Sequence, residues 1–391
     1  MSGLLVILAD RVVTPQRTIE RGAVIVEGVR IAAVDQANLI SIPSGAEVLK
    51  ADVLMAGFID VHVHGAAGHS FGDGTEASRK VASTEASAGV TTCYAGLGAG
   101  ANLAAIAQTV AAAAAAAVGG SAGGARIAGI FMEGPFISPE RKGAWNAAHL
   151  RTPNVAELHE LITAAQGQIR RVNVAPELAG ALEFIREARE QGIVVSLGHS
   201  NATYEESLAG IEAGASITNH TYNAMSPLDH RNPGLVGATL SRDELLAELI
   251  LDHVHVHPAA AAALLRARGS SGVALITDGS AMAGMADGIY ETPTRTVIVK
   301  DGSARLPDGT LAGSVGTFDQ GVRNAASLLG SDLGALSAIS STNAAKAMGI
   351  ARETGSVEAG LFADLVLLDI NLRVQATISR GEVIYRREKQ E

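Results

Sequence analysis

The middle of this 391-residue chain alternates short apolar runs with helical stretches, and this alternation constrains the fold more than any other feature. Eight runs have the length of buried strands, and most end in a polar or glycine-rich turn. They are residues 58–63, 89–94, 126–132, 171–175, 193–197, 216–219, 248–251 and 273–277. Helical stretches between them are 102–118, 155–165, 179–191, 202–213 and 258–267. This pattern predicts an α/β fold, a (β/α)8 TIM-like barrel, with an open doubly wound sheet as the alternative.

Both ends of the chain contain β-prone runs without helical periodicity. These runs are residues 4–8, 23–26, 30–34, 363–368, 374–378 and 383–385. We therefore expect a small β-sandwich domain formed by residues 1–52 plus 356–391, beside a hydrolase barrel over residues 53–355. Between the eighth strand and the second β region, the pattern predicts a hairpin and two helices, at 294–299 with 303–306, 318–329 and 332–348.

The composition excludes several classes of protein. With 30 Lys plus Arg against 40 Asp plus Glu, the net charge of −10 argues against a nucleic-acid partner. The longest apolar run, residues 110–118, is far shorter than the ~20 residues of a membrane span. The start lacks the basic residues and cleavage pattern of a signal peptide, and the single Cys93 excludes an intrachain disulfide. The sequence thus predicts a cytoplasmic protein with no membrane partner.

The first predicted barrel strand carries two histidines, His62 and His64. Side chains alternate along a strand, so both imidazoles should face one side while Val61 and Val63 face the other. Their backbone positions would lie roughly 6–7 Å apart, which allows both to reach one ion. Two polar residues on a half-exposed strand would show the same pattern.

Other metal-type side chains stand where further predicted strands end. Glu133 follows the third strand, His199 the fifth, His220 the sixth and Asp278 the eighth. In a barrel these strand ends meet at one face, where active sites are built. We therefore expect a metal site there.

Histidine and carboxylate ligands without a thiolate suit Zn, Mn, Fe or Co. A catalytic metal lowers the pKa of its bound water to about 7, and a nearby carboxylate can accept the proton. We assign that role to Asp278, which would also donate the proton to the leaving group.

These motifs resemble the amidohydrolase superfamily, with His62-x-His64 on the first strand, histidines after strands five and six, and Asp278 after strand eight. The segment 355–366 is similar to that superfamily's return into its β domain. Further motifs resemble the N-acetylglucosamine-6-phosphate deacetylase family. They are Met132-Glu133-Gly134-Pro135-Phe136, Gly198-His199-Ser200, His220-x-Tyr222-Asn223-Ala224-Met225 and Leu311-Ala312-Gly313-Ser314.

The resemblance implies a function and a set of roles. A metal-bound hydroxide would cut the acetamide of N-acetylglucosamine 6-phosphate into acetate and glucosamine 6-phosphate, with Asp278 as general base and acid. Glu133, His199 and His220 match the main metal ligands, and His62 and His64 match a second position, so one or two ions per subunit are expected, Zn first. Substrate contacts are expected at Ala144, Trp145, Asn223, Ala224, Arg231, His255, Leu311, Ala312 and Gly313. The family also implies a homodimer.

The sequence departs from the family near the substrate. Trp145 stands where the family usually has a sugar-contacting histidine, so a different N-acyl amino sugar phosphate, such as N-acetylgalactosamine 6-phosphate, or another amide stays an alternative. Strand four offers no lysine to bridge two metals, so Glu133 would have to bridge them. Two other hypotheses stay open: a glycosidase that uses Glu133 and Asp278 as its carboxylate pair, and a metal-binding protein without catalysis.

Overall fold

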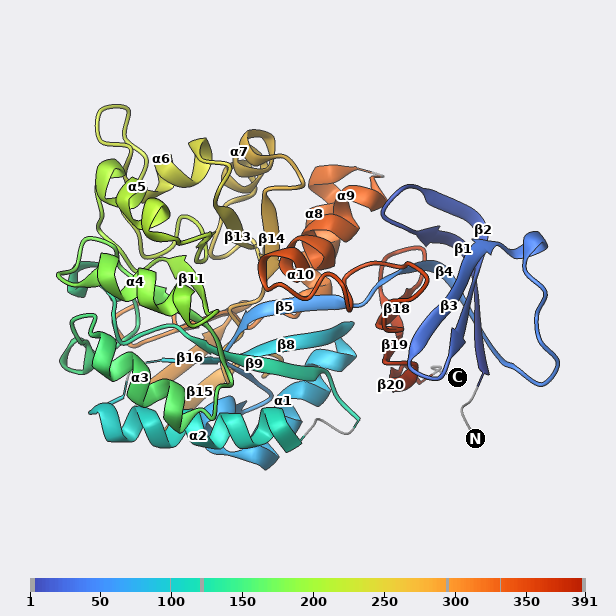
Figure 1. The fold of residues 1–391 in the computed structure, drawn as a ribbon, viewed down its shortest axis with the longest axis horizontal. Helices are drawn as coiled ribbons and strands as arrows, with labels where there is room; N and C mark the ends of the chain where they lie inside the picture. The colour runs from blue at the N-terminus through green and yellow to red at the C-terminus, as the bar shows by residue number, and fades with distance from the viewer. Residues whose placement is uncertain (1–3, 99, 120–122, 293–294, 331, 389–391) are drawn as a thin grey trace.

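The computed structural model describes residues 4–98, 100–119, 123–292, 295–330 and 332–388, which form a barrel with a second sheet at one side (Figure 1). Within these ranges the barrel sheet has eight strands, each parallel to its neighbours and in chain order. The strands are β5 (Phe58–Val63), β8 (Val90–Leu97), β9 (Arg126–Met132), β10 (Ile169–Val174), β11 (Val194–Leu197), β12 (Ile217–Thr218), β13 (Leu246–Ile250) and β14 (Val273–Ile276). All eight predicted strands are therefore found.

The first and last barrel strands meet at their carboxyl ends. The backbone N–H of Asp278 donates to the carbonyl of His62 at 2.8 Å, and that of His64 donates to Gly279 at 2.8 Å. Lower on the seam, the hydroxyl of Thr277 donates to the carboxylate of Asp60 at 2.5 Å. These contacts close the sheet, so the predicted barrel is confirmed over the open-sheet alternative.

Helices surround the barrel and cover the outer face of its strands (Figure 1). They are α1 (Thr75–Ser87), α2 (Leu103–Gly119), α3 (Val155–Ala164), α4 (Ala181–Glu190), α5 (Tyr204–Ala213), α6 (Gly234–Ser241), α7 (Pro258–Arg268), α8 (Phe318–Leu329), α9 (Leu333–Ser337) and α10 (Asn343–Ala347). One π turn, Ala338–Thr342, joins α9 to α10. No helix in the described ranges has the length and apolar content to cross a membrane.

The lower part of the barrel interior is filled by apolar side chains from several strands. They include Ile59, Val61, Phe131, Ile217 and Ile250, and α10 packs against the same cluster. Full burial of one such side chain contributes about 1.5–3 kcal/mol. The interior below the mouth is therefore a packed core and not a channel.

Two helices, α1 and α6, were not predicted from the sequence. The buried face of α1 consists mainly of small residues such as Ala77, Ser78 and Ala82, with Val81 as the largest aliphatic member. The core of α6 is likewise rich in glycine, alanine and threonine. Such faces give a weak hydrophobic period, because small side chains differ little from their polar neighbours in hydropathy.

The two chain ends form one mixed sheet in the order β20-β19-β18-β4-β1-β2-β3. Its strands are β1 (Leu4–Val13), β2 (Thr18–Glu27), β3 (Arg30–Gln36), β4 (Glu47–Ala56), β18 (Leu365–Leu368), β19 (Val374–Ser379) and β20 (Glu382–Arg386). Leu54 of β4 packs inside this sheet, whereas Val53 and Met55 face the barrel's outer core. The predicted β region built from both ends is confirmed, while the domain limits 1–52 plus 356–391 and 53–355 stay a prediction.

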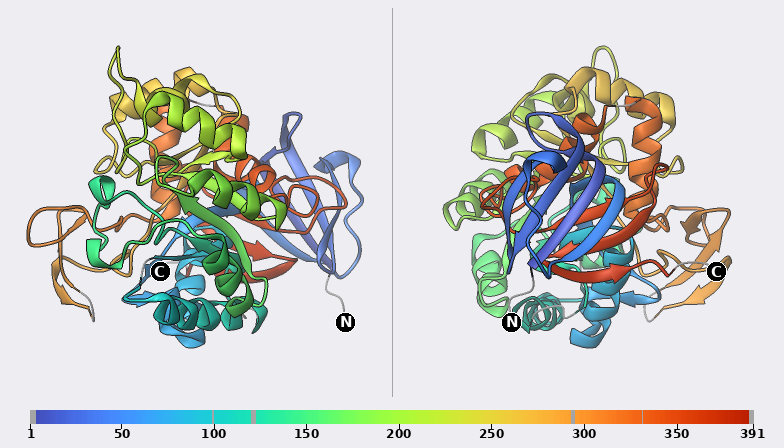
Figure 2. Two further views of the ribbon diagram at one scale, coloured as in Figure 1. Left: turned by 60° about the vertical axis from the view of Figure 1, so that its left-hand side comes forward. Right: turned by 90° about the vertical axis from the view of Figure 1, so that its right-hand side faces the viewer.

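A small hairpin unit projects from the barrel between β14 and α8 (Figure 2). It consists of β15 (Gly288–Glu291), β16 (Thr296–Lys300) and β17 (Ser303–Arg305). The predicted hairpin at 294–299 and 303–306 corresponds to β16 and β17, although Thr294 lies outside the described residues. Short elements elsewhere are β6 (Gly65–Ala66), β7 (His69–Ser70) and the 3-10 helices Ala37–Leu39, Phe71–Asp73, Pro139–Arg141 and Ala147–His149.

Candidate active site

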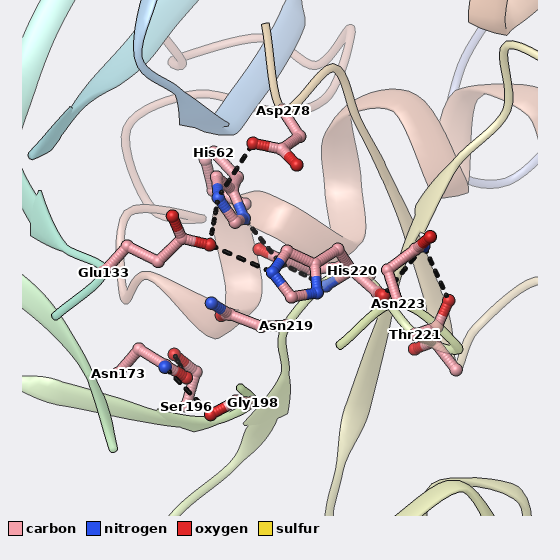
Figure 3. Close-up of polar contacts among 12 residues, drawn as sticks. His62, Glu133, Asn173, Ser196, Gly198, Asn219, His220, Thr221, Asn223 and Asp278 are labelled. Carbon is pink, nitrogen blue, oxygen red and sulfur yellow. Dashed lines mark hydrogen bonds and ion pairs between the residues drawn. The ribbon is translucent and has the colours of Figure 1, made fainter. Parts of the chain in front are cut away.

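Six side chains with metal-binding groups converge at the carboxyl ends of the barrel strands. Figure 3 labels His62, Glu133, His220 and Asp278 among them. The six form two groups that share one carboxylate: His62, His64, Glu133 and Asp278, and then Glu133, His199 and His220. Within each group the candidate ligand atoms lie within 4.8 Å of one another. The structure thus brings together every residue that the sequence predicted for metal binding and proton transfer.

His62 of β5 and His64, which directly follows this strand, reach the site through an irregularity in the strand. The pairing of β5 with β8 shifts register between Asp60 and Val63, and the carboxylate of Asp60 accepts the backbone N–H of His62 at 3.0 Å. As a result Val61 packs in the barrel interior and Val63 in the outer core. The expectation that both valines share one face is therefore wrong, because a bulge re-aims the side chains beyond it.

The other strand ends turn at the functional residue itself. His199, His220 and Asp278 have φ values of +48°, +23° and +48°, in the left-handed region. This conformation costs a non-glycine residue roughly 1–2 kcal/mol. Such backbone strain is concentrated at functional sites, where the surrounding structure holds it in place. The sequence could not show this, because a left-handed turn is usually marked by glycine.

Glu133 stands at the centre of the cluster. Its Oε1 lies 3.1 Å from Nε2 of His62, 3.0 Å from Nε2 of His220 and 3.3 Å from Nε2 of His199. Its Oε2 lies 3.1 Å from Nε2 of His64. A carboxylate with both oxygens engaged can bridge two metal positions. Because strand four has no lysine to serve as the bridge, this is the arrangement that two metal ions would require.

The donor set fits a divalent cation. Nε2 of His199 and Nε2 of His220 face each other at 3.1 Å, and the corresponding atoms of His62 and His64 at 3.3 Å. The outer ring nitrogen of His199 lies 2.7 Å from the carbonyl of Arg141, to which it donates, so the inner nitrogen of the neutral ring carries a lone pair. Lone pairs that converge in this way repel one another unless a cation or protons lie between them.

The charges of the cluster reinforce one another. Burial alone would raise the pKa of Glu133, but His62, His64 and His199 hold it well below the usual range. Burial likewise opposes protonation of His62, yet the carboxylates around it raise its pKa well above the ordinary value. The carboxylates thus favour positive charge among the histidines of the cluster.

Asp278 lies at the edge of this cluster, as Figure 3 shows. Its Oδ1 is 3.5 Å from Nε2 of both His62 and His64. Its side chain is 14% exposed, against 4% for Glu133. Asp278 is therefore the acid that a molecule entering the barrel mouth can reach.

Most of the predicted substrate contacts border the cluster. Asn223 donates its side-chain amide to the carbonyl of His220 at 3.2 Å, and the carbonyl of Ala224 accepts the backbone N–H of Ser200 at 3.1 Å. His255, half-buried, contacts Asp252 at 2.7 Å. Although burial lowers its pKa, that contact and the charge of Asp278 raise it above the ordinary value.

The segment Leu311–Gly313 lies against the end of β14. Gly313 has a φ of +73°, and a Cβ there would come within 3.1 Å of the backbone oxygen of Asp278. The following residue, Ser314, donates its backbone N–H to that same oxygen at 2.8 Å. This contact fixes the predicted segment beside the candidate acid.

Trp145 lies beside His64, which directly follows β5. Its ring is 6.0 Å from that of His64 in an edge arrangement. A Cβ added at Gly98 would come within 1.7 Å of the indole, so the tryptophan requires that glycine. The neighbouring carbonyl of Ala144 accepts a hydrogen bond from Arg295 at 3.1 Å.

Arg231 is the predicted contact that does not join this assembly. It is exposed, and among the described residues its contacts lie within its own loop, where Nη1 lies 2.6 Å from Nε2 of His230. Its predicted contact with a phosphate stays a prediction.

Sequence reasoning missed three residues near the site. Glu248 of β13 and Arg171 of β10 are fully buried beneath the ligands, and they form an ion pair. Arg295 lies between β15 and β16; burial lowers the pKa of its guanidinium, whereas the charges of Asp278 and Glu133 raise it. The sequence does offer a signal for Arg171 and Glu248, because each is a charged residue inside an otherwise apolar strand. No sequence signal marks Arg295.

Comparisons with known proteins agree with this geometry. Residues 53–384 match the model of the Amidohydrolase family. The chain is 36% identical over 335 residues to the N-acetylglucosamine-6-phosphate deacetylase of Bacillus subtilis, covering 85% of both chains. It is 37% identical over 361 residues to the N-acetylgalactosamine-6-phosphate deacetylase of Escherichia coli, covering 90% of this chain and 93% of that one.

A solved structure extends the likeness to the whole fold. It is a variant of the N-acetyl-D-glucosamine-6-phosphate deacetylase from Mycobacterium smegmatis, in complex with N-acetyl-D-glucosamine-6-phosphate. It matches with a TM-score of 0.91 and 32% identity, over 98% of this chain and 99% of that chain. The resemblance predicted from the motifs is confirmed, and this chain belongs to the amidohydrolase family of metal-dependent hydrolases.

Proposed function

We propose that this chain deacetylates N-acetylglucosamine 6-phosphate, giving glucosamine 6-phosphate and acetate. The observation that carries the proposal is the convergence of Glu133 and four histidines beside Asp278 at the barrel mouth. The relatives and the solved structure that act on or hold N-acetylated sugar phosphates support the substrate class.

Glu133, His199 and His220 would hold one metal ion, and His62 and His64 would hold a second with Glu133 as the bridge. A bound divalent ion would lower the pKa of a water to about 7 and polarise the amide carbonyl. The nitrogen and oxygen donors without a thiolate favour Zn, and Fe, Mn or Co also suit them. The metal content of the purified protein distinguishes these ions.

Asp278 would move the proton during hydrolysis. Its carboxylate accepts a proton from the attacking water as the new C–O bond forms. It then gives that proton to the amide nitrogen as the C–N bond breaks, so the amino sugar leaves as an amine. His255, oriented by Asp252, would contact the sugar or the amide carbonyl, and Trp145 and the segment 311–313 would enclose the acetyl end.

The experiment is an acetate-release assay on the purified protein before and after metal removal by a chelator. We expect activity to disappear with the metal and to return when a divalent ion is restored. Activity that survives complete metal removal, or a metal-loaded protein with no turnover on any N-acetyl sugar phosphate, would contradict the proposal.

The second candidate substrate is N-acetylgalactosamine 6-phosphate. Two observations favour it: the relative from Escherichia coli that acts on this epimer, and the presence of Trp145 in the substrate region. Assaying both epimers side by side decides between them. Repeating the assay with unphosphorylated sugars and the Arg231→Ala variant tests the predicted phosphate contact, because that variant should affect the phosphorylated substrates alone. The homodimer and the cytoplasmic location stay predictions. Analytical sedimentation of the purified protein would measure the oligomeric state.

A further inference from the structure

We propose that Glu248, held by Arg171, is a positioning residue that fixes one histidine of each metal-binding group and so couples the two groups. The inference rests on the metal site of the proposed function. It adds a buried carboxylate and a buried arginine that touch no substrate and act only through His62 and His220.

One oxygen of Glu248 contacts both histidines. Its Oε2 lies 3.0 Å from Nδ1 of His62 and 3.1 Å from the backbone nitrogen of His220. The other oxygen, Oε1, accepts from the guanidinium of Arg171, which is always charged. A carboxylate paired with a guanidinium accepts hydrogen bonds, so both nitrogens donate to Oε2.

This contact decides the tautomer of His62. Because the proton of the neutral ring is on Nδ1, the lone pair is on Nε2, the atom that lies 3.1 Å from Glu133. Histidine ligands of metals commonly donate their outer nitrogen to a carboxylate in this way, which raises their basicity and fixes the ring.

The same contact holds the backbone at His220. That residue has a left-handed φ of +23°, and in the described part of the chain its Nδ1 has no hydrogen-bond partner. The ring is therefore oriented through the backbone, and Glu248 accepts the N–H at the strained turn. His199 differs, since the carbonyl of Arg141 fixes its ring directly.

Arg171 keeps Glu248 in place. Its Nη1 donates to the other carboxylate oxygen, Oε1, and its Nη2 donates to the side-chain oxygen of Asn219. Nη1 also reaches the carbonyl of Val61 at 3.3 Å, and Nε reaches the hydroxyl of Ser196 at 3.2 Å. From its own strand β10, the guanidinium thus joins β5, β11, β13 and the residue that follows β12.

A purely structural role is a weaker explanation for this pair. A buried ion pair recovers little of its desolvation cost, and apolar residues of similar size often stabilise a core as well. Here one oxygen of the carboxylate accepts from Arg171, and the other contacts two residues of the metal site. The contacts of Glu248 are thus directed at the metal site as well as at its ion-pair partner.

The test is Glu248→Gln, which keeps the shape and removes the charge. We expect the affinity for Zn²⁺ at both positions to fall by about 10–100-fold, the size typical of lost outer-sphere partners. Affinity is measured by chelator competition on metal-free protein, together with the number of ions bound and the absorption spectrum after loading with Co²⁺. Glu248→Asp, which restores the charge, should recover part of the affinity.

The matched control is Glu85→Gln, the same change at another buried glutamate, on α1. Burial and the charges of Asp60 and Asp319 raise the pKa of Glu85 well above its usual value. A raised pKa favours the neutral acid, whose size and shape glutamine keeps. This variant should bind Zn²⁺ as the wild type does.

Folding is checked by thermal unfolding of each variant. If Glu248→Gln leaves Arg171 unpaired and does not fold, the double variant with Arg171→Met removes both charges together. Weak Zn²⁺ binding by the folded double variant would support the proposal, and wild-type affinity would overturn it.

Wild-type affinity in folded Glu248→Gln, or a loss confined to one of the two positions, would also overturn the proposal. Acetate release by the wild type is measured on the same preparation. A wild type that binds metal without releasing acetate would count against the proposed function alone, because the metal affinities can still be compared.

Discussion

The metal cluster and the surrounding substrate face of the barrel mouth are built in different ways. Four of the six cluster residues are more than nine-tenths buried, His64 directly follows strand β5, and each member contacts others of the cluster within 3.5 Å. Trp145, Arg231 and Arg295, by contrast, are on loops and are at least partly exposed. In the proposed function the barrel itself would thus fix the reaction chemistry, and recognition of the sugar would depend on loop segments that can change without disturbing it.

The largest effect is expected at Asp278, the proposed proton carrier, which lies between the metal cluster and the substrate face. Asp278→Asn keeps the shape of the side chain but removes the base, so kcat should fall by about 10²–10⁴-fold. Steady-state acetate release measures this, and metal analysis should show the ions still bound. A variant that keeps most of its kcat would remove Asp278 from the proton path.

A smaller effect is expected at Arg295, on the substrate side. Arg295→Met removes the hydrogen bond to Ala144 and a cation that faces an anionic substrate, so KM should rise by about 10-fold with little change in kcat. The control is Zn²⁺ affinity, which should equal that of the wild type. A fall in kcat at constant KM would instead place the arginine with the metal cluster.

The smallest effect is expected at Gly98. In Gly98→Ala the new methyl group meets the indole of Trp145, which must move, so KM should change several-fold while the metal content stays constant. Gly119→Ala provides the comparison, because a Cβ there meets nothing within 4 Å. Equal KM values for both variants would show that the position of Trp145 does not affect substrate binding.

The same contrast explains how much the sequence could predict. Strands β5 to β14 are apolar runs, and each candidate ligand stands at a strand end, so position along the chain was enough to identify the cluster. Arg171 and Glu248 are 77 residues apart, and Arg295 and Ala144 are 151 apart. No periodicity in the sequence relates residues this far apart, because their contact depends on how the whole barrel and its loops fold together. The helices α1 and α6 were missed for a local reason, namely their small buried side chains.

The seam between β5 and β14 has a consequence for how the enzyme matures. The backbone groups that join the two strands belong to His62, His64, Asp278 and Gly279, so ring closure and assembly of the reactive centre are one event. A chain without its eighth strand would therefore lack part of the candidate site. An ion held by these side chains would favour the closed ring by mass action, because it would bind the folded state alone.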